Sequence, residues 1–108
     1  MRYEVRIGAE AERDLEAIYD YIAVNDSAVN ARRLLDALMR VAESLATFPQ
    51  RGSHPGELVG FGYNQYRQAI LKPWRLIYRI IGRQVFIDLV ADGRRDLRSL
   101  LAQRLLSA

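Results

Sequence analysis

The chain has 108 residues, of which 50% are hydrophobic and none is cysteine, and its formal net charge is +3. This length suits one domain that buries roughly 60–70% of its unfolded surface, and the lack of cysteine excludes disulfides and thiolate chemistry. No apolar run approaches the roughly 20 residues of a membrane span, and no signal-peptide pattern follows Met1. We therefore expect a single cytoplasmic domain over residues 1–108, with no membrane partner.

The charge is divided unevenly along the chain. Residues 1–48 carry six basic and nine acidic side chains, a net of −3, whereas residues 49–108 carry ten basic and four acidic ones, a net of +6. Only Lys72 among the sixteen basic residues is lysine. Arginine suits bidentate contacts with carboxylate or phosphate. Genome composition can also produce such a bias, although it does not explain the clustering.

The first half of the sequence predicts a strand followed by two helices. Residues 2–7 alternate charged and apolar side chains, which indicates a half-buried strand. Helical spacing of apolar residues and an acidic first turn predict a helix from about Ala9 to Val24. Asp26 or Ser27 is placed to cap a second helix, which Pro49 and Gly52 end. Its apolar stripe comprises Ala31, Leu34, Leu35, Leu38, Ala42 and Leu45, widened by Met39, Val41 and Phe48.

A long irregular segment, residues 50–62, contains four of the seven glycines and the single histidine, His54. We interpret His54 as a solvated loop residue, because no cluster of metal ligands and no nucleophile–base pair accompanies it. We therefore expect neither a metal nor a cofactor.

Three strands follow, over residues 66–71, 74–81 and 85–91. The last two read as a hairpin around a Gly82-Arg83 turn. In that register, residues whose numbers sum to 165 are paired, and one face is wholly apolar. That face pairs Leu76 with Leu89, Tyr78 with Ile87 and Ile80 with Val85. The other face pairs Arg75 with Val90, Ile77 with Asp88 and Arg79 with Phe86.

Because side chains alternate across a strand, these two sets cannot mix. We expect the apolar face to be core and the arginine face to hold any functional site, with Asp88 paired to Arg75 or Arg79. Leucines at helical spacing then predict a short C-terminal helix from Leu97 to Leu105. The order strand, two helices, three strands, helix predicts an α+β fold: an N-terminal strand, an antiparallel two-helix hairpin, a three-stranded antiparallel sheet and a short C-terminal helix, with helices on one face of the sheet.

The arginine face has three interpretations that the residues leave open. The first interpretation is a groove for phosphate or a partner's carboxylates. The second is a protein-binding surface rich in arginine, and the third is a set of solvated arginines lying over apolar side chains. Cleavage of RNA without a metal needs an acid and a base beside one phosphate, and the chain has no evident pair of this kind. The residues concerned are Arg67, Arg75, Arg79, Arg94, Arg95 and Arg98.

The order and spacing of three segments resemble the RelE/ParE superfamily of toxins from bacterial type II toxin–antitoxin systems. These segments are AERDLEAIYDYIAVND, ESLATFPQRG and KPWRLIYRIIGRQVFIDLVADGRRDLRSLL. The resemblance covers nearly the whole chain. It implies an antiparallel sheet with a helical hairpin packed against it, and a cognate antitoxin that forms a hetero-oligomer with the chain.

RelE-type members of this superfamily cut mRNA on the ribosome. Arg75 matches the arginine of their aromatic-Arg strand motif, and Arg94 or Arg95 matches the basic pair after the last strand. Other positions depart from the pattern. RelE has lysines where this chain has Tyr66 and Gln68, and it has a late tyrosine near the position of Leu101. Many relatives have histidine where this chain has Asp92.

ParE-type members instead poison DNA gyrase through protein–protein contact, and FPQRG and the DGRRD-to-leucine helix look more like this branch. The hypothesis is a ParE-like toxin without a catalytic site or cofactor, which binds DNA gyrase and is neutralised by its antitoxin. The alternative is a RelE-like, ribosome-dependent mRNA endoribonuclease. The residues expected to contact target or antitoxin are Arg67, Arg75, Arg79, Arg94, Arg95, Arg98, Leu101 and Leu105.

Overall fold

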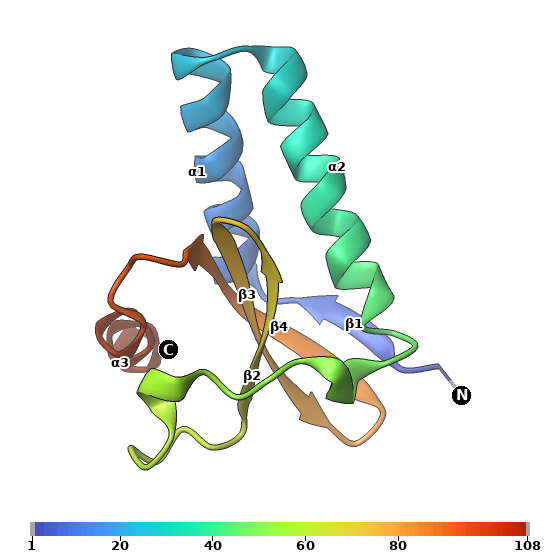
Figure 1. Cartoon of the computed structure of the whole chain (residues 1–108), viewed down its shortest axis with the longest axis vertical. Helices are drawn as coiled ribbons and strands as arrows, with labels where there is room; N and C mark the ends of the chain where they lie inside the picture. The colour runs from blue at the N-terminus through green and yellow to red at the C-terminus, as the bar shows by residue number, and fades with distance from the viewer. Residues whose placement is uncertain (1, 108) are drawn as a thin grey trace.

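A computed structural model describes residues 2–107 and has the predicted order of elements (Figure 1). The helices are α1 (Ala9–Asn25), α2 (Ala28–Ser44) and α3 (Leu97–Ser107). The strands are β1 (Glu4–Ile7), β2 (Tyr66–Leu71), β3 (Trp74–Ile81) and β4 (Gln84–Asp92). Two 3₁₀ turns are present: Pro49–Arg51 at the start of the segment predicted to be irregular, and Gly56–Leu58 within it. The α+β prediction is confirmed.

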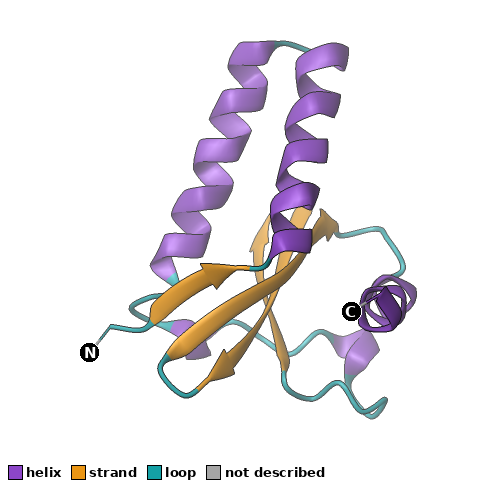
Figure 2. Cartoon of the chain, turned by 180° about the vertical axis from the view of Figure 1, so that it is seen from behind, coloured by secondary structure: helices purple, strands orange, loops and turns teal. Residues whose placement is uncertain are grey.

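The strands form one sheet in the order β1-β4-β3-β2. Strands β2, β3 and β4 are antiparallel, as predicted, and β1 adds to β4 in parallel. Figure 2 shows α1 and α2 rising from this sheet as a hairpin, with α3 lying apart from them. The N-terminal strand therefore belongs to the same sheet as the central hairpin.

The connection between α1 and α2 follows the prediction, whereas the end of α2 does not. The Ser27 hydroxyl accepts a hydrogen bond from the Asn30 backbone N–H at 3.0 Å, which caps α2. Helix α2 ends at Ser44, before Pro49, because the Leu45 N–H turns back to the Ala42 carbonyl and tightens the last turn. The prediction that Phe48 widens the apolar stripe is wrong, since that side chain lies beyond the helix and is 65% exposed.

A β-bulge changes the register of the central hairpin. The pairs nearest the turn, including Tyr78 with Ile87 and Arg79 with Phe86, are those predicted. The register then shifts between Ile77 and Tyr78, and Asp88 becomes the extra residue in β4. Beyond the bulge the predicted pairs are wrong, and the observed ones are Ile77 with Leu89, Leu76 with Val90 and Arg75 with Ala91.

Both faces of the sheet are covered. On one face α1 and α2 pack over Tyr78, which has no exposed surface, and over the other core residues of that face. On the other face α3 and the 3₁₀ turn at Gly56–Leu58 pack over Ile77 and Leu89, which are 0% and 1% exposed. The prediction that the helices pack on one face of the sheet is therefore wrong, because α3 packs on the opposite face, toward which the bulge turns Leu89. The second core comprises Leu58, Tyr66, Ile77, Leu89, Leu97 and Leu101.

Within residues 2–107, no helix has the length and apolar character needed to cross a membrane.

Candidate functional site

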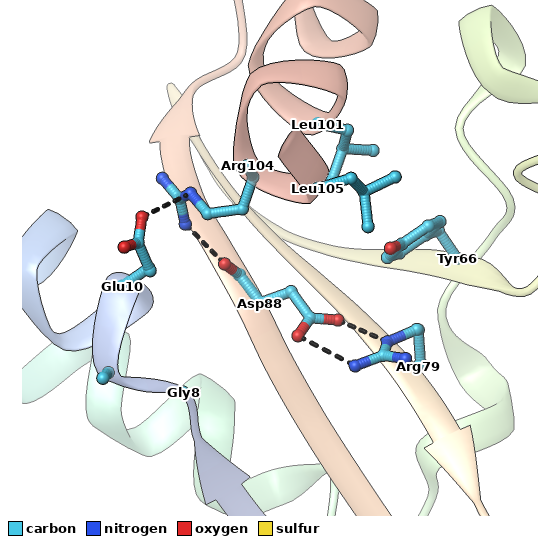
Figure 3. A pocket seen from close by; sticks show the side chains of 9 residues that line it. Gly8, Glu10, Tyr66, Arg79, Asp88, Leu101, Arg104 and Leu105 are labelled. Atoms are coloured by element: carbon cyan, nitrogen blue, oxygen red, sulfur yellow. Dashed lines mark hydrogen bonds and ion pairs between the residues drawn. The ribbon is translucent and has the colours of Figure 1, made fainter. Parts of the chain in front are cut away.

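A pocket of about 260 Å³ lies where α3 passes over the sheet, beside the start of α1 (Figure 3). It brings together three residues predicted for the site, Arg79 from β3 and Leu101 and Leu105 from α3. Tyr66 from β2 and Asp88 from the bulge complete the sheet side. The second face of the sheet thus carries the candidate site, although α3 covers much of it.

Arg79 and Asp88 form a bidentate ion pair at the sheet side of this pocket. The Arg79 Nε and Nη2 atoms donate to the two Asp88 carboxylate oxygens at 2.6 and 3.1 Å. This hydrogen bond raises the pKa of Arg79. The guanidinium carbon also lies 5.9 Å from the ring centroids of Tyr66 and Phe86. The predicted pairing of Asp88 with one of the two strand arginines is confirmed for Arg79.

Arg104 closes the other side of the pocket, and the sequence reasoning missed it. Its guanidinium donates to both carboxylate oxygens of Asp14 at 3.2 and 3.0 Å and to the Asp88 carbonyl at 2.6 Å. It also lies 3.2 Å from the Glu10 carboxylate. Since Asp14 additionally accepts the Val90 N–H at 2.9 Å, these groups tie α3 to α1 and β4. The available signal was the second of two arginines within the leucine-rich pattern of the C-terminal helix.

Arg75 is held away from the pocket by a second bidentate pair. Its Nη1 and Nη2 atoms donate to the Glu57 carboxylate at 3.0 and 2.9 Å, and Nη1 donates to the Gln68 amide oxygen at 3.2 Å. The Arg75 side chain is only 13% exposed. The hydrogen bond from Arg75 lowers the pKa of Glu57, a residue that the sequence reasoning did not select.

Arg67 does not belong to the arginine face. It pairs with Tyr78 across β2 and β3, so its side chain lies on the face that α1 and α2 cover. Its guanidinium donates to the Gln50 and Gly52 carbonyls at 3.1 and 2.8 Å. The interpretation that grouped it with Arg75 and Arg79 is wrong, because side chains alternate along β2.

The three arginines nearest the end of β4 are exposed. Arg94 is 86% exposed and folds back on the Asp92 carboxylate, with Nη2 at 2.8 Å from an oxygen. Arg95 is exposed, and the guanidinium carbon of Arg98 lies 4.4 Å from the Phe61 ring centroid. Three of the six exposed basic residues of the second half therefore lie around the start of α3, and the other three are Arg51, Lys72 and Arg83.

The two leucines predicted as contact residues differ in burial. Leu101 is 1% exposed and belongs to the core under α3, whereas Leu105 is 53% exposed at the pocket. His54 is an exposed loop residue, as predicted, with Nδ1 2.9 Å from the Tyr66 carbonyl. No group of three potential metal-ligating side chains occurs in the described part of the chain.

The charge pairs decide what this pocket can do. Arg79 is matched by Asp88 and Arg104 by Asp14 and Glu10, and burial raises the pKa of the Tyr66 hydroxyl. Breaking such partly buried pairs leaves an uncompensated charge. The arrangement therefore suits a rigid contact surface better than a cleft with free cations.

The Asp92–Arg94 pair gives a pH-dependent prediction. The hydrogen bond from Arg94 lowers the pKa of Asp92 from 3.8 to about 2. A carboxyl with a lowered folded-state pKa stabilises the fold above its unfolded pKa, and that contribution is lost as the pH falls through about 2. We expect Arg94→Ala to return the Asp92 midpoint toward 3.8 in a carboxyl-carbon NMR titration.

The matched control for this titration is Arg95→Ala. Arg95 acts on Asp92 only as a nearby charge, and its effect is the smallest of the causes. A larger shift in Arg95→Ala than in Arg94→Ala would contradict the pairing.

Comparison with known protein families gives a family match over most of the chain. Residues 5–97 match the family described as the ParE toxin of the type II toxin–antitoxin system parDE. Toxin ParE3 of Caulobacter vibrioides is 28% identical over 91 residues, which cover 84% of this chain and 87% of that protein.

Solved structures give the same fold. A chain of the chromosomal ParDE system from P. aeruginosa superposes with a TM-score of 0.71 and 19% identity, covering 84% of this chain and 96% of that one. A chain of the RelBE2 toxin–antitoxin complex from Mycobacterium tuberculosis superposes with a TM-score of 0.62 and 26% identity, covering 85% of this chain and 99% of that one. A mutant of E. coli toxin RelE in its free state superposes with a TM-score of 0.55 and 16% identity, covering 99% of this chain and 97% of that one.

Proposed function

The chain belongs to the ParE toxin family of type II toxin–antitoxin systems, and we propose that it binds DNA gyrase and is neutralised by a cognate antitoxin. The ParE-type toxins that the sequence resembles act on gyrase through protein contact. The chain would act in the cytoplasm and form a hetero-oligomer with the antitoxin. Two of the solved structures with this fold come from a ParDE system and a RelBE2 toxin–antitoxin complex, which supports an antitoxin partner.

The observation that carries the proposal is the pairing of the arginines. A site that binds and cleaves RNA needs free cations and proton-transfer groups beside one phosphate. Here Glu57 holds Arg75 and Asp88 holds Arg79, each with two hydrogen bonds. The exposed residues near the start of α3 and Leu105 are left to contact a protein. Those residues are Arg94, Arg95, Arg98 and Leu105.

A specific observation also favours the RelE-like endoribonuclease as second candidate. In the sequence resemblance, Arg75 matches the arginine of the aromatic-Arg strand motif of RelE-type toxins, and the RelBE2 chain is 26% identical to this one. For this activity Arg75 would contact the RNA substrate only after its ion pair with Glu57 breaks.

The test is expression of the chain without its antitoxin. We expect growth arrest with induction of the DNA-damage response and gyrase-linked DNA breaks, and rescue by the product of the neighbouring reading frame. Cleavage of translated mRNA with early loss of protein synthesis would establish the second candidate. Unchanged growth at confirmed protein levels would refute the toxin role altogether.

A further inference from the structure

A second hollow shares Arg104 with the pocket described above. It is a groove of about 430 Å³ between α1, the end of the β3–β4 pair and α3. Ala17 and Tyr21 line it from α1, Trp74 from β3 and Leu100 from α3. The groove thus has apolar walls from three elements that are far apart in the sequence.

The apolar wall on α1 continues out of the groove along the helix. Ala17, Tyr21 and Val24 are spaced four and three residues apart, so they lie on one face of α1. Tyr21 is 65% exposed and Val24 is 83% exposed. Over seven residues this track extends about 10 Å at the helical rise of 1.5 Å per residue. An exposed apolar track that leads into an apolar hollow is typical of a site that receives a partner segment.

The charges around the groove favour an acidic partner. Asp14 is paired with Arg104, and Asp92 is paired with Arg94. Arg95, which also lines the groove, is exposed and makes no ion pair with any carboxylate in the described part of the chain. A carboxylate placed here would therefore meet one cation that is in no ion pair with the carboxylates lining the groove.

We infer that this groove receives a segment of the cognate antitoxin in which an apolar side chain is followed or preceded by a carboxylate. The apolar side chain lies between Tyr21, Trp74 and Leu100, and the carboxylate contacts Arg95. This inference rests on the proposed function, because it assigns a docking site to the proposed antitoxin. The family match ends at residue 97, where α3 begins, so the α3 wall of the groove lies almost entirely outside the matched region.

Two variants test the groove with different chemistry. Arg95→Glu reverses the charge, and Ala17→Trp fills the hollow from an exposed position without removing any core contact. The matched controls are Arg33→Glu and Ala28→Trp, which change exposed residues of α2 that do not line the groove. Each purified variant is first checked for an unchanged melting temperature. Its dissociation constant for the product of the neighbouring reading frame is then measured by titration calorimetry.

We expect Arg95→Glu and Ala17→Trp each to weaken binding about tenfold or more, a difference of about 1.4 kcal/mol, while the controls bind like wild type. Binding of both groove variants within about twofold of wild type would overturn the groove and leave the toxin proposal intact. If wild-type chain neither arrests growth nor binds that product, the proposed function fails and the groove assignment fails with it. A variant with a lowered melting temperature is replaced in the same assay by Tyr21→Gln, compared with Val29→Gln on α2.

Discussion

Replacing Leu101 by alanine is expected to lower the free energy of unfolding by about 2–5 kcal/mol, the range for removing a buried leucine side chain. Leu101 is 1% exposed and packs with Ile77 and Leu89 beneath α3. The loss leaves a cavity between the helix and the sheet, because β3 and β4 cannot move closer without disturbing the core on their other face. Denaturant unfolding followed by circular dichroism measures the change.

Leu105→Ala is the matched control, since the same substitution is made one helical turn later at a side chain that is 53% exposed. We expect this variant to unfold within about 1 kcal/mol of wild type, because little apolar surface is lost from the core. Equal effects at the two positions would mean that α3 does not cover the sheet as described. A loss of partner binding without loss of stability in Leu101→Ala would restore the original prediction that Leu101 is a contact residue.

The second large effect is expected at Arg104. Arg104→Ala should lower the free energy of unfolding by about 2–4 kcal/mol, because Asp14 and the Asp88 carbonyl lose a charged donor in a partly buried position. The Arg104 and Asp14 side chains are 19% and 20% exposed, so solvent screens them only in part. The expected change includes a higher rate of proteolysis in the segment between β4 and α3, measured alongside denaturant unfolding.

Arg13→Ala provides the control for Arg104. Arg13 also pairs with Glu10, but its side chain is 71% exposed, and such surface pairs contribute at most about 1 kcal/mol. A double-mutant cycle with Asp14→Ala isolates the coupling between Arg104 and Asp14. A coupling energy near zero would show that the pair does not hold α3 against α1.

Local sequence patterns were enough to predict the elements. The strand at the N-terminus, both long helices, the Ser27 cap and the Gly82-Arg83 turn all follow from alternation, helical spacing or turn chemistry that neighbouring residues carry. The face assignment failed because it depends on the bulge at Asp88, and nothing in the residues around position 88 distinguishes a bulged strand from a regular one. One extra residue was sufficient to move Leu89 from the core under α1 and α2 to the core under α3.

Only the part of the candidate site whose residues lie close together in the sequence was predictable. Asp88 and Arg79 lie on neighbouring strands joined by a short turn, so hairpin register brought them together in the prediction. Glu57 with Arg75, and Asp14 with Arg104, join segments 18 and 90 residues apart. Counting arginines therefore overestimated the free positive charge, because the carboxylates that neutralise them come from a loop and from α1.

The bulge also bears on how residue roles are transferred between relatives. In a homologue whose fourth strand has regular alternation, the residues after the bulge correspond to those of this chain only if a one-residue gap is placed at Asp88. Without that gap, each residue of this chain from Leu89 onward is aligned one position away from its true counterpart in the homologue. Residues that face one side of the sheet are then matched to residues that face the other side. Arg94 and Arg95 are adjacent, so such a shift would exchange the arginine that is paired with Asp92 for the one that lines the groove.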